Sequence, residues 1–416
     1  MIDNFKPVSH RAGARRFSRI TTNTTPNTSS TPKPDFKLPE EIAEEQWPEP
    51  KNEAPRKKGR FSWRTLTRFH RLTKKQWLIV GILLVMIGGG GVGAWYKFFK
   101  KETPKPAPVV LRTKKEPPKP TTEASRLTGV QVTPEQNLLP VTGAMIENSP
   151  DARPQSGLKD AGLVFEAVAE GGITRFLALY MDTQPDYIGP IRSARPYYLD
   201  WILPFEGSLA HVGGSPDALA QIKALGVRDL DQFANSGSYK RISKRYAPHN
   251  VYSGLPTLTD LERKKGFGTS TFTGFARKKE EPSATPNARS VDLNISSFLY
   301  NAHYDWDQTT NTYKRSQGGQ PHNDEGSSSQ LAPKVVIALV MPKGVAGDGI
   351  HTTYTTVGSG PMFVFQDGVI TPGTWTKTDR KAQFTFVNAS GATMTLNPGQ
   401  TWISIVGTVG SVTSKP

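Results

Sequence analysis

The sequence contains no cysteine among its 416 residues. This absence excludes disulfide bonds, a thiol nucleophile, cysteine-based zinc sites and lipid attachment at a cysteine. Several enzyme motifs are also missing: HExxH, GxSxG, GxGxxG at a strand–helix junction, and a Walker-type loop. No two histidines stand four residues apart, as a helical metal site would need (His10, His70, His211, His249, His303, His322, His351). The sequence therefore predicts no metal and no cofactor, and it leaves open whether the protein is an enzyme.

Positive charge is concentrated at the N-terminal end of the chain. Residues 1–120 hold 25 Lys and Arg against 10 Asp and Glu, whereas residues 121–416 hold 27 against 26. The net charge of +16 therefore belongs almost entirely to the first 120 residues. A folded nucleic-acid-binding domain needs a basic surface on the domain itself. The nearly neutral main body argues against nucleic acid as a partner.

The first 76 residues have the composition of a disordered, basic tail. The segment 21–34, TTNTTPNTSSTPKP, is typical of a region rich in Ser, Thr, Asn and Pro, with few large apolar residues. Nine Lys and Arg follow between Arg56 and Lys75, interleaved with Phe61, Trp63 and Phe69. Such a segment either lies on anionic lipid headgroups or serves only as a flexible basic flank.

A run of twenty uncharged residues, WLIVGILLVMIGGGGVGAWY, occupies residues 77–96. Its length matches a helix that crosses the hydrocarbon core, and Trp77, Trp95 and Tyr96 stand where interfacial aromatics occur. We therefore predict a single transmembrane helix at residues 77–96, in contact with membrane lipid. The region before it is too long for a cleaved signal peptide, so this helix is expected to remain as an anchor.

The charges on either side of this helix set its expected orientation. Eight Lys and Arg lie in the twenty residues before it and seven in the twenty after it, a small bias toward a cytoplasmic N-terminus. Residues 97–132 form a Pro- and Lys-rich spacer, which proline keeps extended. The expected molecule is a single-pass protein of the cell membrane, with a cytoplasmic tail at residues 1–76 and an extracytoplasmic C-terminal body.

The body is predicted to contain two modules joined by a polar linker at residues 269–287. In the first module, residues 133–268, strands are predicted at 141–146, 173–181 and 207–212, helices at 195–201 and 216–225, and a helix or a helix plus a strand within 156–169. The second module, residues 288–416, is strand-rich, with a hairpin at 304–315 and a core strand at 335–341. The predicted fold class is α+β: an α/β-type module followed by a mostly antiparallel β module, behind the transmembrane helix. Pattern alone does not decide whether strands of the first module pair in parallel.

Four segments of the first module resemble one bacterial family: ENSPDARPQSGL (Glu147–Leu158), GGITRFLALY, IGPIRSARPYY and APHNVYSGL (Ala247–Leu255). Three segments of the second module resemble the same family: YKRSQGGQPHND (Tyr313–Asp324), GTWTK (Gly373–Lys377) and LNPGQTWISIV (Leu396–Val406). On these residues the chain, from about 135 to 416, resembles the YerB-like lipoproteins, whose domain has no known function. The resemblance implies a location at the bacterial cell surface and a two-module body. It implies no reaction, and the transmembrane helix would replace a lipid anchor.

Polar residues of the first module form the candidate site. Arg175 interrupts a strand that is otherwise apolar, and a buried charge needs a partner. Arg192 and Arg195 stand three residues apart, so that both guanidinium groups could converge on one anion. The alternative is that the Glu–Arg pairs are internal ion pairs and the histidines cap backbone groups. The catalytic candidates are Glu147, Glu170, His211 and His249, and the ligand-binding candidates are Arg175, Arg192, Arg195, Arg245 and Asn250.

Three functions are compatible with these residues. The first is a membrane-anchored protein of the cell envelope that binds an anionic wall polymer through an arginine-lined cleft. The second is an envelope hydrolase or transferase that acts on an anionic glycan with a Glu/His acid–base pair. The third is a structural partner of another membrane protein. A carboxylate and a histidine within hydrogen-bond reach in one open cleft would favour the second, whereas a large exposed apolar patch would favour the third.

Overall fold

The computed structural model describes residues 73–79, 81 and 121–416. The chain divides into two units, Met1–Val110 and Leu111–Pro416, and each is described by itself. In the first unit, residues 74–79 and 81 are helical, and the rest of the span predicted at 77–96 lies outside the described residues, as do residues 1–72 and 97–120. None of the helices in the described ranges is long and apolar enough to cross a membrane.

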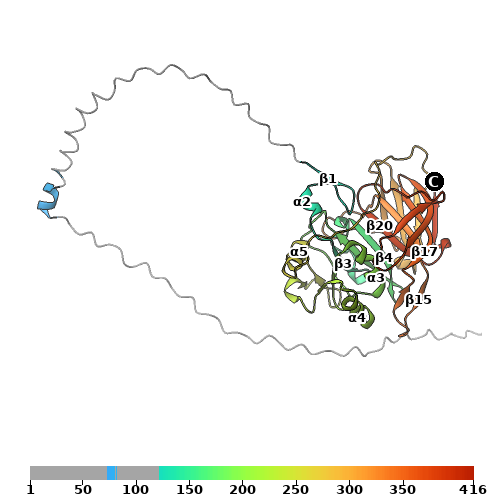
Figure 1. The fold of residues 1–416 in the computed structure, drawn as a ribbon, viewed down its shortest axis with the longest axis horizontal. Helices are drawn as coiled ribbons and strands as arrows, with labels where there is room; N and C mark the ends of the chain where they lie inside the picture. The colour runs from blue at the N-terminus through green and yellow to red at the C-terminus, as the bar shows by residue number, and fades with distance from the viewer. Residues whose placement is uncertain (1–72, 80, 82–120) are drawn as a thin grey trace, which may run out of the picture. The chain divides into compact units, whose positions relative to one another are not determined.

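One ten-stranded sheet runs through the second unit and contains strands from both predicted modules. Strands β20 and β4 pair in parallel, with Thr401 opposite Leu163, so the two halves of the body share one sheet (Figure 1). The strand order is β19 (Thr385–Asn388), β18 (Val369–Lys377), β17 (Gly358–Gln366), β14 (Val335–Val340), β20 (Thr401–Val406), β4 (Leu163–Glu170), β5 (Ile173–Tyr180), β3 (Thr142–Glu147), β6 (Ser208–His211) and β7 (Arg228–Asp231).

A second, fully antiparallel sheet has five strands from the C-terminal half. Its order is β13 (Gln320–Pro321), β12 (Thr312–Gln317), β11 (Ala302–Asp307), β10 (Ser290–Leu293) and β21 (Val412–Lys415). The hairpin predicted at 304–315 is β11–β12, and the turn between β17 and β18 is Asp367-Gly368, both with positive φ. The C-terminal half is not purely antiparallel, because β14 and β20 pair in parallel.

Three short strand pairs complete the β-structure. They are β1 (Glu123–Ala124) with β2 (Gln131–Val132), β8 (Lys240–Arg241) with β9 (Val251–Tyr252), and β15 (Lys343–Val345) with β16 (Thr352–Tyr354). The pair β1–β2 lies in the segment predicted as spacer, where Leu127 and Val132 are buried. In the segment predicted as linker, Phe272 and Phe275 pack against the core. Apolar residues in both segments therefore attach them to the body.

Helices are few and short in the body, which is β-rich. They are α2 (Pro134–Asn137), α3 (Pro196–Ile202), α4 (Pro216–Leu225) and α5 (Leu255–Lys264), with 3-10 turns η1 (Pro150–Ala152), η2 (Leu158–Asp160), η3 (Leu203–Phe205), η4 (Ser236–Ser238), η5 (Phe298–Tyr300) and η6 (Val409–Ser411). Helix α4 begins as predicted, since the Ser215 side chain accepts a hydrogen bond from the backbone N–H of Ala218. The segment 156–169 forms η2 and then β4.

The central strands of the ten-stranded sheet, β14, β20, β4, β5 and β3, are buried on both faces. Leu177 and Leu179 of β5 pack in one core with α3 and α4, whereas Phe176 and Ala178 pack in a second core with α5 and the five-stranded sheet. Successive side chains of a strand point to opposite faces, and a strand covered on both faces is apolar throughout. This arrangement explains the continuous apolar run of residues 176–181.

A buried ion pair connects the two sheets. Arg315 of β12 donates hydrogen bonds from Nη2 to both carboxylate oxygens of Glu166 in β4, at 2.9 and 2.8 Å. Both side chains have no solvent exposure. Trp402 Nε1 also donates to Glu166, at 3.0 Å, and the guanidinium lies 4.7 Å from the centroid of the Trp402 ring system. These contacts stabilise both charges away from water.

Candidate functional site

The candidate site lies at one edge of the ten-stranded sheet. Strands β3, β6 and β7 are parallel, and β3 and β4 each run antiparallel to β5, so all four end at the same edge. Their last residues are Glu147, Glu170, His211 and Asp231. In open sheets with parallel strands, ligands bind outside the carboxyl ends of the strands. Three of the four catalytic candidates therefore occupy the edge where such a fold binds ligands.

Glu170 holds two of the predicted arginines. Its Oε1 lies 2.7 Å from Nη2 of Arg175, and its Oε2 lies 2.6 Å from Nη2 of Arg195. Both arginines also donate to the segment between β5 and α3, Arg175 to the carbonyl of Ser193 at 2.8 Å and Arg195 to the carbonyl of Ala194 at 2.7 Å. The Arg175 side chain is 2% exposed. Arg175 and Arg195 therefore have the contacts of an internal ion-pair network.

The electrostatics of this network favour the charged form of Glu170. Burial opposes its ionisation, but the charges of Arg175 and then Arg195 outweigh burial and hold the pKa of Glu170 below its usual value. The network carries one negative and two positive charges, and Arg175 Nε has no hydrogen-bond partner among the described residues. The network of Glu170, Arg175 and Arg195 therefore carries a net positive charge at the carboxyl end of β4.

Glu147 lies beside this network and contacts His249 and Arg192. Its Oε2 is 3.0 Å from His249 Nδ1, and its Oε1 is 3.3 Å from Arg192 Nε. Glu147 and Arg175 are directly opposite each other on β3 and β5, so the two clusters are neighbours. The Glu147 side chain is buried, whereas about a fifth to a quarter of His249 and Arg192 is exposed (21% and 24%). The fold thus places a carboxylate and a histidine at ion-pair distance, although Glu147 Oε2 makes no hydrogen bond among the described residues.

The two ring nitrogens of His249 have different surroundings: Nδ1 faces Ser149 and Glu147, and Nε2 faces the exposed side chain of Asp151. Ser149 Oγ lies 3.3 Å from Nδ1, the nitrogen that faces Glu147, and donates to Glu147 Oε1 at 3.1 Å. The other nitrogen, Nε2, lies 3.9 Å from Asp151 Oδ2, on a side chain that is 83% exposed. In a serine-nucleophile triad the serine and the carboxylate contact different ring nitrogens of the histidine. Here Ser149 and Glu147 both lie beside Nδ1, so the arrangement is not such a triad. With its proton on Nδ1, His249 would present Nε2 as a base toward solvent.

An open hollow of about 540 Å³ adjoins His249 through Asp151. Its basic lining residues are Arg153, Lys244 and Arg245, and its acidic ones are Asp151, Asp324 and Glu325. Arg245 donates to the carbonyls of Asp151 and Pro154, at 2.9 and 2.6 Å, and lies 3.6 Å from Glu325. The hollow is therefore a surface of mixed charge in which Lys244 is the most exposed of the ion-paired cations (74%).

His211 and Asn250 lie apart from these contacts. His211 is buried, with Nδ1 2.7 Å from the carbonyl of Gly213 and Nε2 3.0 Å from Asp229 Oδ1. Asn250 accepts a hydrogen bond from Arg241 at 2.9 Å. Both side chains have the contacts of structural residues.

Sequence reasoning missed Ser149 and Asp151, which follow Glu147 by two and four residues, and Ser193, which follows Arg192 directly. It also missed the ion pair of Glu166 and Arg315, although Arg315 is a charged residue at an inward position of a strand whose buried and exposed residues alternate. Within residues 73–79, 81 and 121–416, no group of three or more His, Asp or Glu side chains could hold a metal ion.

Comparison with known proteins gives consistent matches over the body. Residues 127–268 match the model of the protein of unknown function (DUF3048) N-terminal domain, and residues 291–403 match that of the C-terminal domain of the same family. A relative named "Putative lipoprotein YerB", from Bacillus subtilis (strain 168), is 26% identical over 284 residues, which are 67% of this chain and 85% of the relative. The crystal structure of the YerB protein from Bacillus subtilis superimposes with a TM-score of 0.64 at 25% identity, covering 70% of this chain and 99% of that one. The chain belongs to the DUF3048 family of YerB-like proteins.

Proposed function

We propose that this protein is a membrane-anchored protein of the cell envelope whose body binds an anionic wall polymer at the edge formed by Arg192 and His249. The anchoring is supported by the relative, which is named a lipoprotein. This chain has no cysteine for a lipid, so the hydrophobic run at residues 77–96 would serve as its anchor.

Arg192 is the observation that carries the binding proposal. Arg175 and Arg195 are both paired with Glu170, whereas the terminal guanidinium nitrogens of Arg192 have no hydrogen bond within the part of the chain that the structure describes. Burial lowers the pKa of Arg192, but an arginine remains charged at neutral pH. The Arg192 guanidinium is partly exposed, has free donors and lies near the positively charged network of Glu170, Arg175 and Arg195. Such a group suits a phosphate or carboxylate ligand.

The binding test compares wild type with Arg192→Gln in sedimentation with isolated bacterial cell walls. The purified full-length chain should bind intact walls, and Arg192→Gln should bind them about 10- to 100-fold more weakly, because a charged hydrogen bond contributes roughly 1.5–3 kcal/mol. Walls stripped of anionic polymers should bind neither protein well.

A matched control is Arg263→Gln on α5, whose exposed side chain pairs with Asp260. It removes the same charge at a distance from the edge, and its binding should equal that of wild type. Equal binding by Arg192→Gln and Arg263→Gln would show that Arg192 is not a ligand-binding residue, and the search should then turn to protein partners.

A second candidate function, hydrolysis or transfer on an anionic glycan, is favoured by the contact between Glu147 and His249. A buried carboxylate 3.0 Å from Nδ1 would orient the ring as a general base if a hydrogen bond formed between them on substrate binding, with Nε2 left to accept the proton. The base would accept a proton from water or from a sugar hydroxyl, and Arg192 would stabilise negative charge that develops on the substrate.

If this second function is correct, His249→Gln lowers the release of soluble glycan from isolated walls by a factor of about 100 to 10,000, the usual contribution of a general base. Binding to the walls should persist, because Arg192 remains. The measurement is fragment release over time at equal bound protein. Release by His249→Gln at the wild-type rate, or no release by wild type, would exclude the enzymatic function.

A further inference from the structure

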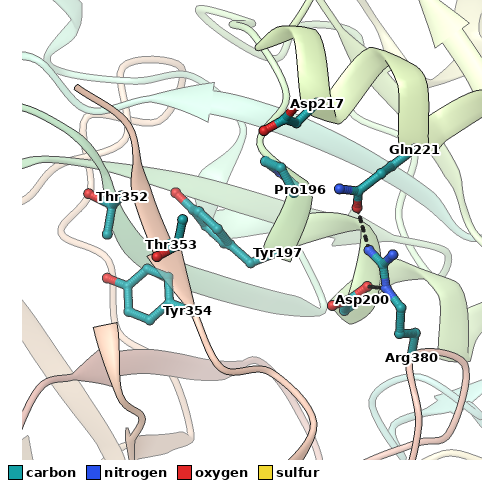
Figure 2. Close-up of a pocket in the computed structure, with 9 residues that line it drawn as sticks. All are labelled: Pro196, Tyr197, Asp200, Asp217, Gln221, Thr352, Thr353, Tyr354 and Arg380. Carbon is teal, nitrogen blue, oxygen red and sulfur yellow. Dashed lines mark hydrogen bonds and ion pairs between the residues drawn. The ribbon is translucent and has the colours of Figure 1, made fainter. Parts of the chain in front are cut away.

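A smaller hollow of about 290 Å³ lies where α3 and α4 meet β16 and the segment after β18 (Figure 2). Helix α3 supplies Tyr197 and Asp200, helix α4 supplies Asp217 and Gln221, and β16 supplies Thr352, Thr353 and Tyr354. Arg380 closes it from the segment between β18 and β19. We propose that this hollow binds an uncharged saccharide, at a site separate from Arg192 and His249.

The charges of the hollow exclude the anionic ligand proposed above. Arg380 is the one cation among the nine residues that line it, and Asp200 and Asp217 are its anions. Arg380 Nε donates to Asp200 Oδ1 at 2.5 Å, and Asp200 is almost fully buried, so this guanidinium charge is already compensated. A phosphate or carboxylate would meet the carboxylate of Asp217 without a free cation.

The same ion pair fixes a set of hydrogen-bonding groups. Arg380 Nη2 donates to Gln221 Oε1 at 2.6 Å, which determines the orientation of the Gln221 amide and leaves its Nε2 hydrogens available. Figure 2 shows this contact on the side opposite Thr352 and Tyr354. Within residues 121–416, Gln221 Nε2, Arg380 Nη1 and the Asp217 carboxylate have no hydrogen-bond partner. Two donors and one carboxylate acceptor match adjacent hydroxyl groups of a sugar, because each hydroxyl can both accept and donate a hydrogen bond.

Two tyrosine rings give the hollow a rigid apolar wall. The rings of Tyr197 and Tyr354 are 4.9 Å apart at 75°. Both tyrosine hydroxyls bond to the backbone of Val168. The Tyr197 hydroxyl donates to the Val168 carbonyl at 2.7 Å, and the Val168 N–H donates to the Tyr354 hydroxyl at 3.1 Å. Tyr354 is half-buried and can pack against the C–H face of a sugar ring. The pocket is at the small end of the range of about 300–1,000 Å³ for ligand sites, which suits one or two rings.

The test is ligand-observed NMR on the purified full-length chain with maltotriose and chitotriose as uncharged probes and galacturonic acid as a charged one. The protein is kept in a detergent without a sugar headgroup, which would otherwise compete. One or both uncharged probes should bind, and Gln221→Ala and Asp217→Asn should each weaken that binding at least tenfold. Lys223→Ala, on an exposed position of the same helix, should bind as wild type does.

Asp217 is exposed and Gln221 half-buried, so neither change is expected to prevent folding, which the melting temperature checks. The proposal is overturned if no uncharged saccharide binds wild type, if both pocket variants bind as wild type does, or if galacturonic acid binds as tightly as the trisaccharides. Binding to anionic wall polymer through Arg192 is a separate measurement and can succeed or fail independently.

Discussion

Arg315→Met is expected to lower the free energy of unfolding of this protein by about 3–5 kcal/mol, the usual cost of removing one partner of a buried ion pair. Glu166 would remain between the two sheets with no solvent exposure, and its hydrogen-bond donors among residues 121–416 would be Trp402, Ser404 and Thr174. The variant would also lose the contact of the guanidinium with the Trp402 ring. Urea unfolding followed by tryptophan fluorescence measures the change.

Two further variants test why Arg315→Met lowers the free energy of unfolding. Lys314→Met changes the adjacent residue, whose side chain is 50% exposed in an ion pair with Asp307, and should alter stability by less than about 1 kcal/mol. The double variant Glu166→Gln/Arg315→Met leaves no buried charge and should recover a large part of the lost stability. A double variant no more stable than Arg315→Met would mean that packing, rather than the unpaired carboxylate, determines the loss.

Glu262→Gln is expected to stabilise the protein at neutral and alkaline pH. Glu262 of α5 is fully buried, and burial raises the pKa of its carboxyl group to about 7. Thr142 Oγ1 donates to one of its oxygens at 2.9 Å, and the other has no hydrogen-bond partner among the described residues. The folded protein therefore favours the neutral carboxyl group.

The sign of the pH dependence follows from the raised pKa. The unfolded chain, with the ordinary pKa of about 4.5, loses this proton earlier than the folded chain. The stabilising contribution is complete below pH 4.5 and is lost as pH rises through about 7. The loss is on the order of 3 kcal/mol at pH 8, which Glu262→Gln should prevent in part or fully.

The measurement is the difference in unfolding free energy between wild type and Glu262→Gln at several values between pH 5 and pH 8. The difference should be small at pH 5 and should grow toward pH 8. Asp260→Asn, an exposed carboxylate on the same helix, should show no such trend. A difference independent of pH would contradict a neutral Glu262 in the folded state.

Local patterns predicted the elements of the body well. Alternation and apolar runs gave the positions of β5, β11, β12 and β14, and Ser215 gave the start of α4. The parallel pairing of β20 with β4 joins residues far apart in the sequence, and no local pattern carries that information. The sequence therefore separated two modules that the fold unites in one sheet.

The contacts of the candidate residues could be predicted from the sequence only in part. A charge on a buried strand required a partner near Arg175, and Glu170 supplies it. The spacing of Arg192 and Arg195 suggested that both point to one anion, but Arg195 contacts Glu170 and Arg192 contacts Glu147. The side-chain directions of Arg192 and Arg195, between β5 and α3, depend on tertiary contacts that their spacing does not determine.

The most direct test of the central claim is the response of individual histidine signals to a soluble fragment of anionic wall polymer. In 15N-histidine-labelled full-length protein, the imidazole signals of His249 should shift on titration, whereas those of buried His211 should not. The same titration with Arg192→Gln should require a higher concentration for the same shift. An unchanged His249 signal, or shifts of His249 and His211 together, would contradict binding at the edge formed by Arg192 and His249.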